Sequence, residues 1–312
     1  MRWRRKWRNQ MRSDGNARLG YGEAKQSGEI QHWLGGNNMQ LTNANYYSQE
    51  ANKAYFSVSQ VKAFMKCPAC AMAELNGQHA PPKTTSLLVG GFVDSYFSGE
   101  IEEFQEANPE VYTKNGSLRA EYRHAQKIID RIEKDPLCMD ITFAPAQQIF
   151  TGEIDGYPFK VKLDFLLSAQ QAQVLAKKYS GMSELLFEDG AIVDMKIMKD
   201  FAPHYREGEG RLNWIEYWQY DLQLAIYQEI VRQNTGKLLP CYILGATKEE
   251  TPDLCLFKLP QEVMNVALDI FRPKLPGIAD VKSGKVKPEM CGTCSYCREN
   301  KVLNGATLFE EV

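Results

Sequence analysis

Three residues near the middle of the chain could share one piece of chemistry: Asp164, Asp194 and Lys196. The last two close the apolar run Ala191–Lys196. Residues i and i+2 of a strand point to the same face, so this carboxylate and ammonium would lie about 6–7 Å apart. A pair of this kind is most often a strand-end ion pair. Burying it is costly unless the charges are paired or functional, which makes the surrounding residues decisive.

Two carboxylates held close together repel each other, and a divalent cation relieves that repulsion. Oxygen ligands suit Mg²⁺, or Mn²⁺, and such an ion keeps bound waters. One water with a lowered pKa can attack a phosphodiester while a lysine stabilises the developing charge. Glu153 could add a further carboxylate from the preceding strand. Gln223 and Tyr227 share one face of a helix at i and i+4, where they could support the site.

A second constellation is the cysteine run Cys291-Gly-Thr-Cys294-Ser-Tyr-Cys297. Three thiolates leave a tetrahedral site one ligand short. Cys67 could supply the fourth, with Cys70 as the alternative. The spacing allows either zinc or an iron–sulfur cluster.

The elements that must position these residues follow from hydrophobic periodicity and turn signals. An Asp155-Gly156 turn between two alternating stretches predicts a hairpin. Residues 168–189 are expected to be an insertion before the Ala191–Lys196 strand. The remaining expected helices cover 57–66, 87–97, 118–134, 213–234 and 261–271, and the expected strands cover 147–154, 157–167, 241–246 and 254–259. This order predicts an α/β fold with a mixed central sheet flanked by helices.

Composition is that of a globular protein, and no apolar run is long enough for a membrane span. With no secretory signal, the eight cysteines are expected to be reduced thiols in a cytoplasmic protein. Residues 1–38 carry eight Lys/Arg against three Asp/Glu, whereas the rest carries 29 against 36. We expect a disordered basic extension at 1–38. A nucleic-acid-binding arm, or a true start at Met39, are the alternatives.

The ordered set Asp164, Asp194-x-Lys196 and Gln223-x-x-x-Tyr227 resembles the PD-(D/E)xK nuclease superfamily, in its RecB-like branch. The phage RecE-type exonucleases (exodeoxyribonuclease VIII-like) are the most similar. The resemblance implies one nuclease domain over residues 39–300, followed by a tail at 301–312.

Two further segments carry the resemblance. Ser57–Pro68 is similar to the opening helix of the branch. Gly90-x-x-x-Asp94 stands where many members have GxxxH, which implies that Asp94 is a metal ligand.

The resemblance also implies the activity. It is Mg²⁺-dependent hydrolysis of linear duplex DNA from 5′ ends, leaving 3′ single strands for a RecT-type annealing protein and recombination. Ring-shaped homo-oligomers are typical of such enzymes. Iron–sulfur members of the branch join one early and three late cysteines, which favours [4Fe–4S] over zinc here.

Two other functions are compatible with these residues. One is an end-processing nuclease of the AddB or CRISPR-associated type that acts on single strands. The other is a metal-stapled DNA-binding module without activity, in which the acid and lysine are structural.

Overall fold

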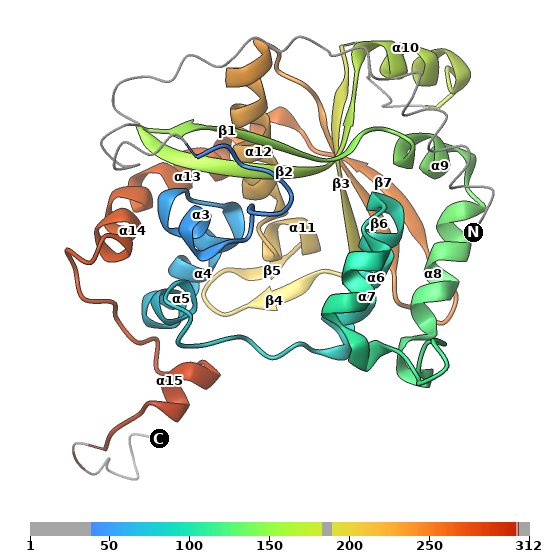
Figure 1. Cartoon of the computed structure of the whole chain (residues 1–312). Helices are drawn as coiled ribbons and strands as arrows, with labels where there is room; N and C mark the ends of the chain where they lie inside the picture. Colours follow the sequence, from blue (N-terminus) through green and yellow to red (C-terminus); the bar gives the residue numbers. More distant parts are fainter. Residues whose placement is uncertain (1–38, 183–188, 304, 306–312) are drawn as a thin grey trace.

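The core is a mixed five-stranded sheet in the order β1-β2-β3-β6-β7 (Figure 1). The computed structural model describes residues 39–182, 189–303 and 305. The β3–β6 pair is parallel and the other neighbouring pairs are antiparallel. The sheet strands are β1 Ala146–Ile154, β2 Tyr157–Leu167, β3 Ala191–Met198, β6 Cys241–Thr247 and β7 Leu254–Lys258. The expectation of an α/β fold with a mixed sheet and flanking helices is confirmed.

Helices cover both faces of the sheet. One face packs on α4, α5, α12, α13 and α14, and the other on α6, α8, α9 and α10. The α-helices are α3 Gln49–Ala54, α4 Val58–Lys66, α5 Pro68–Leu75, α6 Thr85–Ser98, α7 Ile101–Ala107, α8 His124–Glu133, α9 Pro136–Thr142, α10 Ala169–Lys178, α11 Trp214–Tyr217, α12 Tyr220–Thr235, α13 Gln261–Phe271, α14 Leu275–Lys282 and α15 Ser295–Glu299.

The first two strands form the hairpin that the turn signal predicts. Ile154 faces Tyr157 across the Asp155-Gly156 turn. Both turn residues have positive φ, 49° and 79°, as a type I′ turn requires. The hairpin therefore fixes which residues of β2 face the next strand, β3.

The parallel strands β3 and β6 are joined by a crossover that contains α11 and α12. Parallel neighbours need such a long connection because the chain must return to the end of the sheet where the first strand began before the second strand can start. α12 packs on β1 and β2. This connection places the side chains of α12 over the end of β3.

Helices from near the two ends of the described chain pack together. α14, near the C-terminus, packs against α4 and α5 near the N-terminus (Figure 1). α15 contacts α5 in the same region. This closure brings the early and late cysteines within reach of each other.

Three expectations need correction or limits. The single helix expected at 213–234 is two helices, because the positive φ of Gln219, 55°, interrupts the helix between α11 and α12. A small hairpin, β4 His204–Arg206 and β5 Gly210–Leu212, was not expected. Part of the 168–189 insertion is the helix α10, which a capping box at Ser168 starts.

The expected extension at 1–38 lies outside the described residues, as does most of the tail at 301–312. Within the described residues, every helix is too short or too polar to span a bilayer.

Candidate active site and cysteine cluster

The site lies where β2 and β3 separate. Their ladder ends at the pair Phe165–Val193, and Asp164 and Asp194 are the next residues beyond this pair on the open side. The backbone N–H of Met195, which no longer has a partner strand on that side, donates to Asp164 Oδ2 at 2.8 Å. The Asp164 side chain therefore joins β2 to β3 beyond the end of their ladder, and Asp164 and Asp194 both lie at the opening.

Asp194 is almost completely buried, with 2% of its surface exposed. Its Oδ1 accepts a hydrogen bond from Gln223 Nε2 at 2.9 Å. Its Oδ2 lies 2.5 Å from Lys196 Nζ but makes no hydrogen bond of acceptable geometry. A buried carboxylate oxygen without a well-directed donor is costly, and a cation would satisfy it.

Asp94, one turn after Gly90 on α6, faces the same opening. Burial raises the pKa of Asp94 to about 6, and the charge of Asp194 adds to this rise while Lys196 opposes it. Burial, Asp194 and Asp94 likewise raise the pKa of Asp164 well above its ordinary value. Asp94, Asp164 and Asp194 therefore lie close enough for their negative charges to repel one another.

Lys196 is the positive charge closest to these acids. Burial lowers its pKa, but Asp194 and Asp164 outweigh that effect and raise the pKa of Lys196 above its ordinary value. Its Nζ also lies 5.0 Å from the centre of the Tyr220 ring. Lys196 is therefore a fixed, permanently charged ammonium at the opening.

Gln223 and Tyr227 lie together on α12, as their spacing predicts. Gln223 Nε2 is 3.3 Å from the Tyr227 hydroxyl as well as bonded to Asp194. Burial and the nearby acids raise the pKa of Tyr227 well above its ordinary value, so it stays a neutral phenol. The turn at Gln219 starts α12 at the position from which Gln223 reaches β3.

The donor atoms of the three acids are of the kind that binds a divalent cation, but the three carboxylates do not all lie within 4.8 Å of one another. Asp94, Asp164 and Asp194 supply oxygen ligands, the type that Mg²⁺ and Mn²⁺ prefer. The buried Asp194 Oδ2 has no hydrogen bond, and the mutual repulsion of the acids would be relieved by positive charge.

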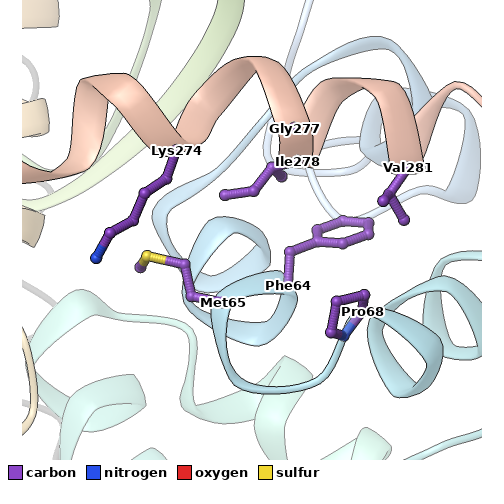
Figure 2. Close-up of a pocket in the computed structure, with 7 residues that line it drawn as sticks. All are labelled: Phe64, Met65, Pro68, Lys274, Gly277, Ile278 and Val281. Atoms are coloured by element: carbon purple, nitrogen blue, oxygen red, sulfur yellow. The ribbon is translucent and has the colours of Figure 1, made fainter. Parts of the chain in front are cut away.

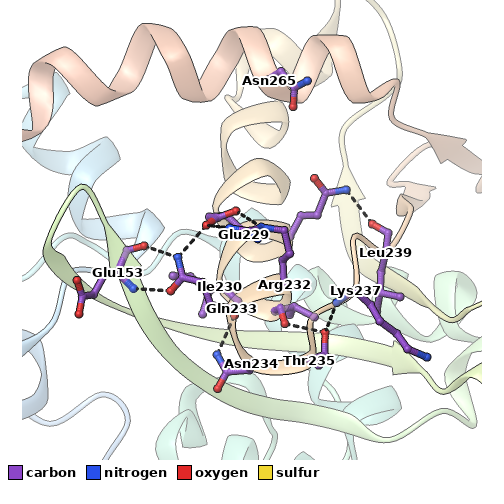
Figure 3. Close-up of polar contacts among 12 residues, drawn as sticks. Glu153, Glu229, Ile230, Arg232, Gln233, Asn234, Thr235, Lys237, Leu239 and Asn265 are labelled. Carbon is purple, nitrogen blue, oxygen red and sulfur yellow. Dashed lines mark hydrogen bonds and ion pairs between the residues drawn. The ribbon is translucent and has the colours of Figure 1, made fainter. Parts of the chain in front are cut away.

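Glu153 does not join this group. It pairs with Pro158 at the turn end of the hairpin, six residues along β2 from Asp164, which is about 20 Å. Its backbone is bound by Gln233 of α12, which in turn contacts Glu229 (Figure 3). Glu153 lies on the strand opposite Asp164, but the register of the hairpin places the two acids at different ends of the strand pair.

The fourth acid near the site is Glu100, just after α6. Its charge adds to the raised pKa of Asp94, and its Oε1 lies 3.2 Å from Lys162 Nζ. A signal existed in the sequence: Lys162 is two residues before Asp164 on the same strand face and needs a counter-ion.

Lys62, on α4, was also missed. Its Nζ donates to the Trp218 carbonyl at 3.0 Å and lies 3.4 Å from Gln223 Oε1. Burial and the charge of Lys196 lower the pKa of Lys62 to about 7. Of the aromatic residues around it, Trp214 is buried in the core, whereas Trp218 is 46% exposed.

Four cysteines converge at the join between the chain ends. The Sγ atoms of Cys67, Cys291, Cys294 and Cys297 all lie within 4.8 Å of one another. Three of the distances are 3.5, 3.8 and 3.8 Å. All eight cysteines of the chain are free thiols.

Backbone N–H groups point at these sulfurs. Those of Cys70, Cys294 and Cys297 lie 3.5, 3.4 and 3.4 Å from the sulfur three residues earlier. Hydrogen bonds from Thr293, first from its side chain, lower the pKa of Cys291 to about 5. Such donors stabilise thiolates, the form that binds metal.

Cys70 is not part of this cluster. Its Sγ lies 3.4 Å from Glu74 Oε1, and His79 completes that separate group. Burial and Glu74 raise the pKa of Cys70 to about 12. Cys67, and not Cys70, is therefore the early cysteine whose sulfur lies beside the three late ones.

A pocket of about 370 Å³ lies on the other side of α4, between it and α14 (Figure 2). Its lining is apolar apart from Lys274, and Phe64 and Met65 reach it from α4. None of the acids of the site lines it, so it is separate from the opening between β2 and β3.

Two comparisons relate this chain to known proteins. A family described as "PDDEXK-like domain of unknown function (DUF3799)" matches residues 57–184 and 177–300. A crystal structure from Eubacterium rectale, described as a "Putative exonuclease", is similar over 88% of this chain and 98% of that chain. The two share 40% identity with a TM-score of 0.76. No curated protein matches the chain.

The family match spans most of the chain and includes both the acids and the cysteine cluster. The chain belongs to the PDDEXK-like family DUF3799.

Proposed function

We propose that this protein is a Mg²⁺-dependent DNA exonuclease that hydrolyses phosphodiester bonds. One observation carries the proposal: Asp194, almost fully buried, faces Lys196 with an oxygen that no hydrogen bond satisfies. Asp94 and Asp164 complete an acidic opening whose negative charge a bound cation would neutralise.

Asp94, Asp164 and Asp194 would hold the cation. When bound, it supplies a nucleophilic water at neutral pH and binds phosphate oxygen. The remaining work belongs to the chain. Lys196 presents a fixed ammonium toward the site of charge development, and Gln223 keeps Asp194 in one orientation.

The finer substrate assignment rests on resemblance. The motifs are similar to those of RecE-type enzymes, and the E. rectale relative is described as a "Putative exonuclease". We infer that the substrate is linear duplex DNA, cut from its 5′ ends to leave a 3′ strand. A RecT-type annealing protein would use that strand in recombination, and a ring of this chain would keep hold of one DNA end.

The test uses three substrates in equal amounts: linear duplex, closed circular duplex and single-stranded DNA. Protein purified without air is incubated with Mg²⁺, with Lys196→Ala alongside. Loss of linear duplex alone, absent in the variant, is the expected result. Duplexes blocked at either the 5′ or the 3′ end then give the polarity.

Two outcomes contradict the proposal. Preferential attack on single strands would identify an end-processing nuclease of the AddB or CRISPR-associated type. Binding of DNA with no cleavage by the wild type would identify a metal-stapled binding module.

We further propose that the four cysteines hold one zinc ion. A tetrahedral ion with Zn–S bonds of about 2.3 Å places its sulfurs about 3.8 Å apart. The distances of 3.5–3.8 Å between Sγ atoms match this arrangement. A [4Fe–4S] cube bound at four corners holds its thiolates farther apart. The thiol spacing thus supports the zinc alternative over the cluster that the resemblance favours.

Elemental analysis of the protein purified without air decides between the two. One zinc per chain and no visible absorption are expected. A brown protein with about four iron atoms per chain would overturn the assignment.

A further inference from the structure

Lys62 reaches the active site from outside the acid-bearing strands. It lies in the middle of α4 and is half-buried. Its Nζ contacts the Trp218 carbonyl at the break between α11 and α12, and Gln223 Oε1 at 3.4 Å. Gln223 uses its other amide atom to hold Asp194. The Gln223 side chain therefore connects Lys62 to the buried Asp194.

Lys62 makes no ion pair among the described residues, unlike Lys196 and Lys162. Lys196 is paired with Asp194 at 2.5 Å and Lys162 with Glu100 at 3.2 Å. Within 39–182 and 189–303, the ammonium of Lys62 has no carboxylate at ion-pair distance, and its contacts are a carbonyl and an amide oxygen.

Lys62 and Lys196 share one aromatic support. Each Nζ lies 5.0 Å from the centre of the Tyr220 ring. Two distances of 5.0 Å limit the separation of the ammonium groups to at most 10 Å. Lys196 faces the acids, whereas the hydrogen bonds of Lys62 go to two neutral oxygens.

We propose that Lys62 binds a phosphate of the DNA strand being cut, a role that rests on the proposed function of the site. Lysine is a compact point charge with rotatable donors, suited to phosphate. The phosphate would take the place of the neutral Trp218 carbonyl as its partner. Exchange of a carbonyl for an anion strengthens the contact.

The cysteine cluster fixes the helix that carries this lysine. α4 ends at Cys67, whose Sγ lies 3.5 Å from that of Cys297. Four helical residues separate Lys62 from Cys67, which caps the C-terminal end of α4 and contacts the late cysteine. The cluster lies outside the acidic site, but it fixes the position of Lys62 relative to that site.

The test measures DNA binding against salt concentration, with Ca²⁺ in place of Mg²⁺ so that strands stay uncut. Each lysine–phosphate contact contributes about 0.7–0.9 to the slope of log K against log salt. We expect Lys62→Gln to reduce the slope by about that amount and to weaken binding roughly tenfold at low salt. Lys62→Arg should keep most of the slope.

Lys66→Gln is the matched control. Lys66 is exposed on the same helix, one turn beyond Lys62, so the substitution removes an equal charge from the same element. It should leave the slope unchanged. Thermal unfolding of both variants checks that the fold is retained.

The result distinguishes two separate failures. An unchanged slope with a reduced rate at saturating DNA would overturn the phosphate contact, because Lys62 would then only position Gln223. A wild type that binds DNA but never cuts it with Mg²⁺ would overturn the proposed function, while the slope would still decide the role of Lys62.

Discussion

Gln223 Nε2 donates to Asp194 Oδ1 over 2.9 Å, so a side chain of α12 holds a buried carboxylate of β3 that lies 29 positions earlier in the chain. The other oxygen of that carboxylate faces Lys196. One side of Asp194 is therefore fixed by the protein, and the other faces the acids of β2 and α6.

Asp194→Asn should abolish cleavage while leaving the fold intact. The substitution keeps the shape but removes the charge that would hold a cation, so we expect a fall in kcat of about 10³-fold or more, or at least ~4 kcal/mol. Steady-state digestion of linear duplex and circular dichroism give the two readings. Asp280→Asn, an exposed acid paired with Lys285, is the control and should cut normally. Cleavage by the Asp194 variant at the wild-type rate would remove the basis of the proposed site.

Gln223→Leu should reduce activity less, by about 10–100-fold. It removes the donor to Asp194 but none of the three acids, and supporting residues of metal sites carry effects of this size. Tyr227→Phe should cost still less, because its hydroxyl contacts only Gln223 at 3.3 Å among the hydrogen bonds seen in the described residues. Cleavage rates over a Mg²⁺ titration test both variants. Equal losses in the two would contradict this ranking.

Cys291→Ser should release the bound metal and destabilise the protein by ~3 kcal/mol or more, because a tetrahedral site loses one of four ligands. Denaturant unfolding and metal analysis measure the two effects. Cys255→Ser is matched in chemistry and half-buried outside the cluster, so it should retain the metal. A metal-loaded Cys291 variant would exclude this residue as a ligand.

Stability should rise with pH through a buried lysine. Burial, with a smaller effect of Lys160, lowers the pKa of Lys282 to about 7 in the folded protein, against about 10.4 when unfolded. Between these values the unfolded chain binds more protons, so the free energy of unfolding increases with pH, by up to ~1.4 kcal/mol per pH unit.

Lys282→Met tests this dependence. Relative to the variant, the wild type should gain stability between pH 7 and 10, measured by urea unfolding at each pH. Lys282 donates to the Tyr55 carbonyl at 2.7 Å, so the variant also loses a hydrogen bond, but that loss shifts the curve without tilting it. Lys285→Met, an exposed lysine nearby, should run parallel to the wild type. Parallel curves for the Lys282 variant would show that its pKa is ordinary.

Much of the site could be predicted because its residues carry local signals. The period of two placed Asp194 and Lys196 on one face, and the helical spacing joined Gln223 to Tyr227. The spacing of the cysteines indicated a metal site before any contact was known. Patterns of this kind survive folding because they depend on a single element.

The remainder depends on how elements meet. Glu153 was misplaced because distance along a hairpin depends on register, and Glu100 was missed because it follows a helix from another part of the chain. The sequence does not mark the break at Gln219, where the backbone has a positive φ although the residue is neither glycine nor proline. Lys62 looks like any lysine on an amphipathic helix until α12 is placed beside it.

The cysteine cluster joins residues 230 positions apart, and this has a consequence during synthesis. At about 5–20 residues per second, a ribosome needs roughly 10–50 s after making Cys67 before it makes Cys297. Until then α4 has no anchor at its end, although all three acids of the site have already been translated. Truncated products that end before Cys291 would therefore lack the cysteine cluster at the end of α4, the helix that carries Lys62.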